Sequence, residues 1–496
     1  MFRKVLVANR GEIAVRILRA LREAGIRSVA VYSDADRASL AVRMADEAVH
    51  VGPAPSRESY LRIDKILDAA QRHGVDAIHP GYGFLSENAA FAEACKATGI
   101  TFIGPPASAI EKMGSKTSAR RVAIAAGAPV VPGTDQAIRD VEAAKETAAR
   151  LGYPVLLKAS AGGGGKGMRR VDREQDLESA LRDASSEALR AFHNDEVYIE
   201  KLVVEPRHIE IQILGDHHGN LIHLGERECS IQRRHQKVIE ECPSPVMLEH
   251  PELRGKMGQA ALKIARAAGY ANAGTMEFLV DRDRNFYFLE MNTRLQVEHP
   301  VTELVTGLDL VEWQLRIAAG ERLTIAQEDV NWRGSAIECR VYAEDPENQF
   351  MPSPGKITYL AEPSGPGVRL DSGVYAGWTV PLDYDSMLAK LAAWAPSREA
   401  AADRLRRALA EYAVEGIRTN IAFFGEILAD PKFRRGELST AFLDEFLQRR
   451  AERKEADIEQ EAVAALIAAL QVPKSAPVNN GKRSAWAMVG REEMMR

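Results

Sequence analysis

The sequence predicts a chain of mixed α/β and α+β class, with an N-terminal doubly wound parallel sheet, a small mobile α/β lid and a mainly antiparallel C-terminal α+β domain. Three observations support this prediction. Short apolar runs alternate with helical patterns over about the first 110 residues, which is typical of a parallel sheet with helices on both faces. A small strand-and-helix unit around a glycine-rich loop follows, and after it come strand patterns joined by hairpin-like turns.

The first unit begins with a buried strand and an amphipathic helix that stops at Gly25. We expect strands at 4–8, 28–32, 75–79 and 101–103, and helices at 11–24 and from near Glu87. A doubly wound sheet binds its ligand beyond the carboxyl ends of its strands. The loop at 79–84 follows such an end, so we expect it to border a ligand crevice.

The second unit surrounds a glycine-rich segment, which consists of Gly162, Gly163, Gly164, Gly165, Lys166 and Gly167. We expect helices at 137–151 and 173–192, and strands at 154–159, 168–171 and 197–201. Glycine lets backbone N–H groups approach phosphate oxygens, and lysine adds a positive charge. Walker A and dinucleotide-binding loops both open a helix, whereas strands flank this loop on both sides. We interpret it as a hairpin-like flap over a nucleotide; a flexible linker is the alternative.

The third unit has the character of an antiparallel sheet with helices. We expect strands at 207–214, 221–228, 275–280, 286–291, 336–343, 356–360 and 368–374, and helices at 251–268, 308–319 and 398–412. Polar turns at 215–220 and 281–285 join neighbouring strands. After about residue 450 the pattern changes to a charged, then alanine-rich helix at 451–470 and a linker at 471–484.

Composition excludes several classes of protein. The chain has 496 residues with 65 Lys+Arg and 70 Asp+Glu, so its net charge of -5 gives no reason to expect binding to nucleic acid or to a membrane. The four cysteines are scattered, which argues for a reducing compartment and against a structural zinc site. No apolar run approaches the roughly 18 residues of a membrane span. We therefore expect a cytoplasmic protein.

Two glutamates predict a metal site. A hairpin between the strands at 275–280 and 286–291 pairs positions whose numbers sum to about 567, so Glu277 faces Glu290. Opposed carboxylates repel each other, and a hard divalent cation such as Mg²⁺ removes the conflict. Asn292 follows on the same face and offers a third oxygen. The alternative is a different register, which leaves one glutamate solvated.

Lysines and a short polar segment indicate anion binding. Lys158 lies in an apolar strand and needs an anionic partner, for which a nucleotide phosphate is a candidate; a lysine on an edge strand is the alternative. Lys116 opens a helix but by itself reads as a surface lysine. In an extended segment Arg294, Gln296 and Glu298 share one side, where they can hold a small planar oxyanion and remove its proton. A structural Arg–Glu pair is the alternative.

The densest basic run, at 232–237, is interpreted as a loop that gathers positive charge around phosphates. A solvated or nucleic-acid-binding face is the alternative, which the mildly acidic chain and the lack of interleaved aromatic residues weaken. Arg340 alternates within a strand pattern and by itself would read as a surface arginine.

Taken together, these segments resemble the biotin carboxylase subunit of acyl-CoA carboxylases of the acetyl-CoA type, an ATP-grasp enzyme, over about residues 1–447. The resemblance is carried by ANRGEIA at 8–14, HPGYGFLSEN at 79–88, KASAGGGGKGM at 158–168, ERECSIQRRHQKVIEE at 226–241, EMNTRLQVEHPVTE at 290–303 and SPGKI at 353–357. It implies an N-terminal domain at 1–113, an ATP-grasp linker and lid at 114–203, a C-terminal ATP-grasp and carboxylase domain at 204–447, and an extra tail at 448–496.

The resemblance also implies roles for individual residues. ATP or the closed flap would contact Lys116, Lys158, the flap residues Gly162–Gly167 with Lys166, Glu200, Lys201, Val203, His208, Gln232 and His235. Mg²⁺ or Mn²⁺ would bind Glu277, Glu290 and Asn292. Bicarbonate would bind Lys237, Arg294, Gln296 and Val297. Glu298 would deprotonate bicarbonate, Arg340 would stabilise the biotin enolate, and Tyr82 would lie beside biotin.

The resemblance implies a biotin carboxylase ligase whose substrates are ATP, bicarbonate and carrier-bound biotin. The Ala-Met-Lys-Met motif that carries biotin is absent from the sequence, so a separate carrier protein and a carboxyltransferase are expected as partners. A homodimer is expected, with Arg19 and Glu23 at its interface, and fatty acid biosynthesis is the expected pathway. Two alternatives stay open at this point: another ATP-grasp ligase, which leaves Arg294, Gln296 and Arg340 unexplained, and a non-catalytic nucleotide-binding scaffold.

Overall fold

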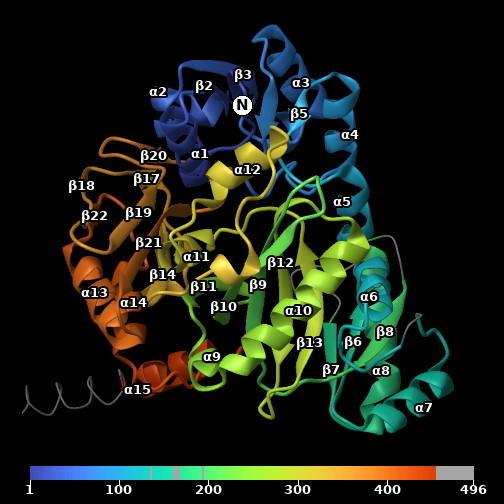
Figure 1. The fold of residues 1–496 in the computed structure, drawn as a ribbon. Coiled ribbons are helices and arrows are strands. Elements are labelled where there is room, and N and C mark those ends of the chain that lie inside the picture. Colours follow the sequence, from blue (N-terminus) through green and yellow to red (C-terminus); the bar gives the residue numbers. More distant parts are fainter. Residues whose placement is uncertain (135–136, 160–167, 193–194, 454–496) are drawn as a thin grey trace, which may run out of the picture. The chain divides into compact units, whose positions relative to one another are not determined.

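The computed structural model describes residues 1–134, 137–159, 168–192 and 195–453, and begins with a parallel sheet of order β3-β2-β1-β4-β5 (Figure 1). Its strands are β1 Lys4–Val7, β2 Arg27–Ser33, β3 Glu47–Gly52, β4 Ala77–His79 and β5 Thr101–Phe102. The helices are α1 Gly11–Glu23, α2 Leu40–Met44, α3 Ile63–Arg72, α4 Ala89–Ala97 and α5 Ala107–Gly114. The predicted parallel sheet is confirmed, although β3, α2, α3 and α5 were missed.

Alternation along β1 explains why helices cover both faces of this sheet. Side chains of a strand point to opposite faces in turn. Val5 packs with Ile13 and Ile17 of α1 in one apolar cluster, whereas Leu6 belongs to a second cluster with Ile66 of α3. The strand is therefore apolar throughout, as strands of a doubly covered parallel sheet are.

The predicted lid is a small antiparallel sheet of order β7-β6-β8 with its own apolar cluster. Its elements are α7 Val141–Leu151, β6 Val155–Ala159, β7 Met168–Val171, α8 Leu177–Phe192 and β8 Val197–Lys201. The preceding helix, α6 Lys116–Ala125, packs instead against α5, α10 and β13. The helix α7 begins later than predicted because Asp140 caps it, with its carboxylate accepting from the N–H of Ala143. Strands do flank the glycine-rich segment, but the segment itself lies outside the described residues.

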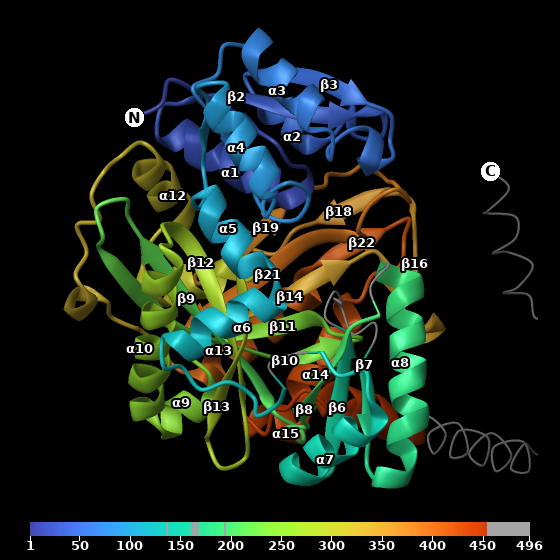
Figure 2. The same ribbon diagram turned by 90° about the vertical axis from the view of Figure 1, so that its right-hand side faces the viewer.

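The C-terminal part is built on an antiparallel sheet of order β13-β12-β9-β10-β11-β14-β21-β19. Its strands are β9 Arg207–Gly215, β10 Leu221–Arg233, β11 Gln236–Cys242, β12 Asn272–Val280, β13 Phe286–Asn292, β14 Ser335–Tyr342, β19 Val368–Ser372 and β21 Met387–Ala395. The helices are α9 Pro245–Glu249, α10 Pro251–Ala268, α11 His299–Thr306, α12 Leu310–Ala318, α13 Arg398–Glu411, α14 Ile421–Ala429 and α15 Pro431–Arg434. Figures 1 and 2 show α10 along β9 and β10, and α13 against β21.

Three sequence predictions in this part are wrong. The basic run at 232–237 is not a loop but a tight hairpin, in which β10 ends and β11 begins on either side of Arg234 and His235. Both turn residues have positive φ, at 50° and 66°. The strand expected at 356–360 is split between β17 Gly355–Lys356 and β18 Tyr359–Ala361, which pair with different partners. The central strands β11 and β21 were missed.

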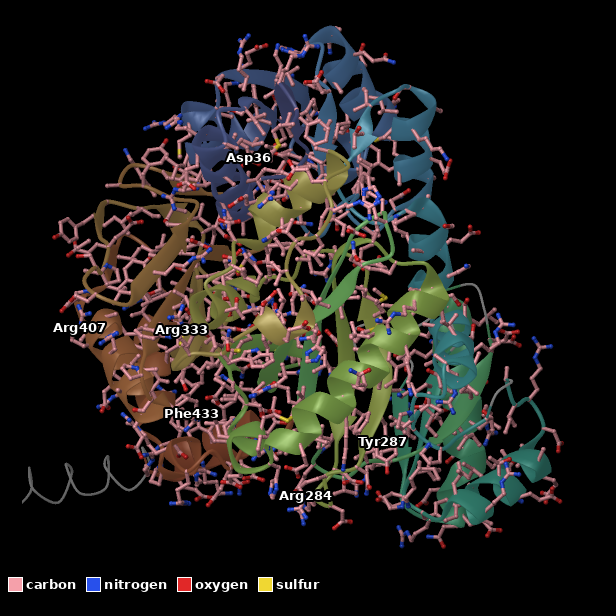
Figure 3. The ribbon with its side chains drawn as sticks, viewed as in Figure 1. Asp36, Arg284, Tyr287, Arg333, Arg407 and Phe433 are labelled. Atoms are coloured by element: carbon pink, nitrogen blue, oxygen red, sulfur yellow. The ribbon has the colours of Figure 1, made fainter. Side chains whose placement is uncertain are left out.

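Short strand pairs and a second unit complete the described chain. The remaining strands are β15 Glu344–Asp345, β16 Met351–Pro352, β20 Thr379–Val380 and β22 Ala413–Glu415. Residues 1–443 form one compact unit, in which the buried Phe433 of α15, marked in Figure 3, lies 4.7 Å from the guanidinium of Arg398. Residues 444–496 form a second unit; its described residues, 444–453, are helical. The helix and linker predicted beyond 453 lie outside the described residues.

Candidate active site

The β12–β13 hairpin brings the two predicted metal-binding glutamates together. Glu277 pairs with Glu290 in the ladder, as predicted, and Thr275 pairs with Asn292. The side chains of Arg284 and Tyr287, marked in Figure 3, lie near the turn end of this hairpin. Asn292 Nδ2 donates to Glu277 Oε1 at 2.8 Å. The in-register pair and the amide therefore gather carboxylate and carbonyl oxygens at one point.

The electrostatics of this pair fit a divalent cation. Burial and the charge of Glu277 raise the pKa of Glu290. Burial alone would also raise the pKa of Glu277, but Lys237 and His208 outweigh it and lower this pKa. Two carboxylates that disfavour each other's charge, with an amide oxygen nearby, form a donor set that suits Mg²⁺ or Mn²⁺. Glu277, Glu290 and Asn292 are the residues that could hold such an ion.

Lys237 lies at the centre of the buried carboxylates. Its Nζ is 2.6 Å from Glu210 Oε2, 2.8 Å from Glu277 Oε1 and 2.8 Å from Glu298 Oε1. Burial would lower the pKa of Lys237, but the three carboxylates raise it well above its usual value. This ammonium therefore keeps its charge and joins the hairpin glutamate to Glu298.

Glu298 is held by a second cation. Arg340 Nη2 lies 2.9 Å from Glu298 Oε2, and Arg340 Nε lies 2.6 Å from Glu240 Oε1. Burial opposes ionisation of Glu298, yet Lys237 and Arg340 lower its pKa well below the usual range. Arg340, interpreted in isolation as a surface residue, is in fact buried. Glu298 is thus a buried, ionised carboxylate between two cations.

Arg294 and Gln296 share a side, as predicted, while Leu295 belongs to the apolar cluster that contains residues of α1 and α12. Arg294 Nη1 donates to Gln296 Oε1 at 2.9 Å, and Arg294 Nε donates to Glu87 Oε2 at 2.8 Å. Glu298 is the N-cap residue of α11, with φ of -81° and ψ of 13°, so the segment is not extended throughout. The Glu298 carboxylate is linked to Arg294 and Gln296 through two intermediates. Lys237 Nζ donates to both Glu298 and Glu277, and Gln296 Nε2 donates to Glu277 Oε1 at 3.3 Å.

A cavity of about 480 Å³ lies beside this network. Among the predicted site residues its lining includes Tyr82, Arg294, Val297 and Arg340. Tyr82 follows β4, where the sequence predicted a ligand crevice. Asn9 fixes the loop, because its Nδ2 donates to the carbonyls of Pro80 at 2.6 Å and Tyr82 at 2.7 Å. The cavity has the cations that a small oxyanion needs and an aromatic wall for a ring.

A second hollow lies between the lid and the hairpin. Its lining includes Lys116, Lys158 and Glu200, together with Arg120 and Tyr198. Lys158 lies on the central lid strand and not on an edge, and it does have an anionic partner, although this is a glutamate and not a phosphate: its Nζ lies 2.5 Å from Glu200 Oε2. Lys116 also faces the hollow, so these side chains can meet an anionic ligand there.

The remaining predicted nucleotide-binding residues do not lie in one place. His208 Nε2 lies 3.0 Å from Glu277 Oε2, and Gln232 Nε2 lies 2.9 Å from His208 Nδ1, so both belong to the buried network. His235 is exposed at the hairpin turn. The amine of Lys201 binds the backbone carbonyl of Gly152 at 2.7 Å, so this side chain is engaged within the lid. Val203 is half-buried just beyond β8.

Several residues of the network were missed in the sequence. They are Glu12, Glu87, Glu210, Arg227, Glu240 and Lys390. A signal exists for Glu210, because His208, Glu210 and Gln212 alternate with isoleucines along β9 and mark a polar face. No comparable pattern marks Lys390, which lies in an otherwise apolar strand.

Comparison with known proteins decides the family. Residues 1–110 match "Biotin carboxylase, N-terminal domain", residues 115–326 match "Carbamoyl-phosphate synthase L chain, ATP binding domain", and residues 338–445 match "Biotin carboxylase C-terminal domain". A pyruvate carboxylase subunit of Methanothermobacter thermautotrophicus is 56% identical over 447 residues, which cover 90% of each chain. The chain belongs to the biotin carboxylase family. Biotin carboxylase 1 of Bacillus subtilis is 52% identical over 90% of this chain and 99% of its own length.

Solved biotin carboxylase structures share the fold. The Campylobacter jejuni structure named as a biotin carboxylase–β-γ-ATP complex has a TM-score of 0.86 and 48% identity, covering 90% of this chain and 99% of that one. The biotin carboxylase domain dimer of Hydrogenobacter thermophilus 2-oxoglutarate carboxylase, in complex with MgADP, ADP and bicarbonate, has a TM-score of 0.84 and 50% identity, covering 90% of this chain and 98% of that one. The predicted biotin carboxylase ATP-grasp fold and ligase class are confirmed. No helix among the described residues has the length and apolar character to cross a membrane.

Proposed function

We propose that this biotin carboxylase uses ATP and Mg²⁺ to carboxylate biotin on a separate carrier protein with bicarbonate, as the first half-reaction of an acyl-CoA carboxylase. The observation that carries the proposal is the position of Glu298, ionised and buried, with Lys237 on one carboxylate oxygen and Arg340 on the other. This arrangement supplies a base together with two cations for anionic substrates beside one cavity.

In the first step Glu298 takes the proton of bicarbonate, which is held by Lys237, Arg294, Gln296 and the backbone of Val297. A bicarbonate oxygen then forms a bond to the γ-phosphorus of ATP while the bond from that phosphorus to the bridging oxygen breaks, so ADP leaves and carboxyphosphate forms. Lys116, Lys158 and the flap residues with Lys166 stabilise the phosphate charge. Mg²⁺ or Mn²⁺, bound by Glu277, Glu290 and Asn292, would supply further charge neutralisation.

In the second step carboxyphosphate breaks down to CO₂ and phosphate, and phosphate removes the N1′ proton of biotin. Arg340 stabilises the enolate, whose nitrogen attacks CO₂, and Tyr82 borders the ring. Water must be excluded because carboxyphosphate is labile, which is the role proposed for the lid. For the nucleotide itself we propose adenine contacts at Glu200, Lys201 and Val203, a ribose contact at His208, and contacts of Gln232 and His235 near the phosphates.

The final acceptor of the carboxyl group is proposed separately from the carboxylation of biotin. Acetyl-CoA, and with it fatty acid biosynthesis, is our proposal, although relatives include pyruvate and 2-oxoglutarate carboxylases. The mouse mitochondrial methylcrotonoyl-CoA carboxylase alpha chain is 52% identical, and the match spans 61% of its length. We propose a separate biotin carboxyl carrier protein, a separate carboxyltransferase, a homodimer and a cytoplasmic location, with domains at 1–113, 114–203, 204–447 and a tail at 448–496.

The test is ADP release from MgATP and bicarbonate, measured with and without free biotin. We expect strong stimulation by biotin that disappears when bicarbonate is omitted. ATP cleavage that is indifferent to biotin would contradict the proposal and favour another ATP-grasp ligase. Tight MgATP binding without any cleavage, even with carrier protein added, would favour a nucleotide-binding scaffold.

A further inference from the structure

Lys390 is a fully buried lysine that the proposed reaction does not use. It lies on β21, directly opposite Arg340 in the β14–β21 ladder, and its side chain has no exposed surface. Two cations opposite each other in a sheet repel, and a buried ammonium is costly unless it is paired. Its partners therefore indicate why the fold contains a lysine at this position.

The first partner is the backbone next to Glu298. Lys390 Nζ donates to the carbonyl oxygen of Val297 at 2.8 Å. Val297 lines the cavity and precedes Glu298, the N-cap residue of α11. This hydrogen bond therefore fixes the wall from which the proposed base and the bicarbonate contacts arise.

The second partner belongs to the opposite wall. Lys390 Nζ lies 3.3 Å from Glu12 Oε2, and the other oxygen of Glu12 accepts a hydrogen bond from the hydroxyl of Tyr82. Lys390 also lies 6.0 Å from the centre of the Tyr82 ring and 3.8 Å from Asp371 Oδ2. Glu12 is on α1 and Tyr82 follows β4, so both come from the N-terminal sheet unit.

One ammonium thus contacts both sides of the cavity, because Val297 belongs to the loop before α11 whereas Glu12 and Tyr82 belong to the N-terminal unit. Asp371 balances part of the charge from β19 on the third side. A merely structural ion pair would need only a carboxylate. The additional bond to the Val297 carbonyl makes the position of one wall depend on the other.

We propose that Lys390 is a positioning residue that connects the Val297 wall to Tyr82 through Glu12 and so sets the spacing at which bicarbonate and biotin meet. The inference rests on the proposed carboxylation of biotin. It assigns no contact between Lys390 and substrate. Its consequence is that, without Lys390, CO₂ still forms but is captured poorly by biotin, while nucleotide binding is retained because the hollow between the lid and the β12–β13 hairpin does not include Lys390.

The test compares Lys390→Met with Lys4→Met, a matched control. Lys4 also binds a carboxylate and a carbonyl, Glu47 at 2.9 Å and His73 at 2.8 Å, but at the end of β1 away from the cavity. We expect Lys390→Met to lower kcat/KM for free biotin by about 10²-fold, the usual cost of misplacing reacting groups by about 1 Å. KM for MgATP should stay within about twofold, and ADP release per carboxybiotin should rise.

A double-mutant cycle with Tyr82→Phe separates positioning from stability. We expect the losses in kcat/KM for biotin to be non-additive, because both changes break the same connection. Additive losses, or equal losses for biotin and MgATP, would overturn the inference. If Lys390→Met does not fold, Glu12→Gln takes its place in the cycle with the same criteria. A wild-type enzyme without biotin-stimulated ADP release would instead refute the proposed function.

Discussion

Arg340 Nη2 lies 2.9 Å from Glu298 Oε2, so the cation assigned to the biotin enolate also binds the carboxylate assigned as the base. A carboxylate with a lowered pKa is a weak base. We infer that Glu298 gains basicity when anionic substrates share the charge of Lys237 and Arg340. The two proposed half-reactions are then coupled through one guanidinium.

Replacing Glu298 should slow the chemistry strongly without weakening nucleotide binding. Glu298→Gln keeps the shape of the side chain, and Lys237 retains Glu210 and Glu277 as partners. We expect MgATP affinity by calorimetry to be unchanged and turnover to fall by about 10²–10⁴-fold, the usual contribution of a general base. Near-wild-type turnover would remove Glu298 from this role. Glu437→Gln, which alters an exposed pair with Arg435, is the control.

Arg340→Ala should affect the second half-reaction more than the first. We expect bicarbonate-dependent ATP cleavage to survive better than biotin carboxylation, because only the latter forms the enolate. The change also leaves Glu240 without its 2.6 Å partner, so the informative quantity is the ratio of the two rates and not either rate alone. Arg340→Lys keeps the charge but loses the fork geometry and should give an intermediate ratio. Equal loss of both activities would argue against an enolate-specific role.

The opposed glutamates of the hairpin should respond differently to neutralisation. Glu290→Gln removes a like-charge conflict, so we expect no loss of thermal stability without metal, but a reduced gain in Tm from MgADP. Glu277→Gln breaks contacts with Lys237 and His208 and should lower Tm even without metal. Thermal unfolding of both variants with EDTA gives the Tm without metal, and the same measurement with MgADP gives the gain in Tm. A wild-type Tm gain in Glu290→Gln would exclude Glu290 as a ligand.

Glu12 predicts a pH dependence of stability. Burial, opposed by Lys390, raises the pKa of Glu12 to about 7 from its usual 4.5. The folded state therefore holds a proton that the unfolded chain releases, so this contribution is complete below pH 4.5 and is lost as pH rises through about 7. A shift of this size corresponds to about 3 kcal/mol of stability. Urea unfolding of the wild type and Glu12→Gln between pH 5 and 8 should show a smaller dependence in the variant; parallel curves would contradict the prediction.

The sequence predicted much of the fold where the evidence is local. The hairpin register of Glu277 and Glu290 follows from two short strands and the turn between them, and the structure confirms it. The parallel sheet follows from repeated strand-and-helix patterns. The missed strand β11 contains the adjacent carboxylates Glu240 and Glu241, which are buried against Arg340 and Arg398. A polar sequence is therefore a poor guide to exposure where arginines far away in the chain neutralise its carboxylates.

By itself, the sequence determined the family, the order of the structural units and the pairing of the hairpin glutamates, because motifs and the two-residue period of strands are properties of neighbouring residues. Only the tertiary structure decided that Lys237 meets Glu210, Glu277 and Glu298, and that Lys390 joins Val297 to Glu12. These contacts depend on the order of strands in the sheet. That order is set by packing between segments far apart in the chain, which local patterns do not encode.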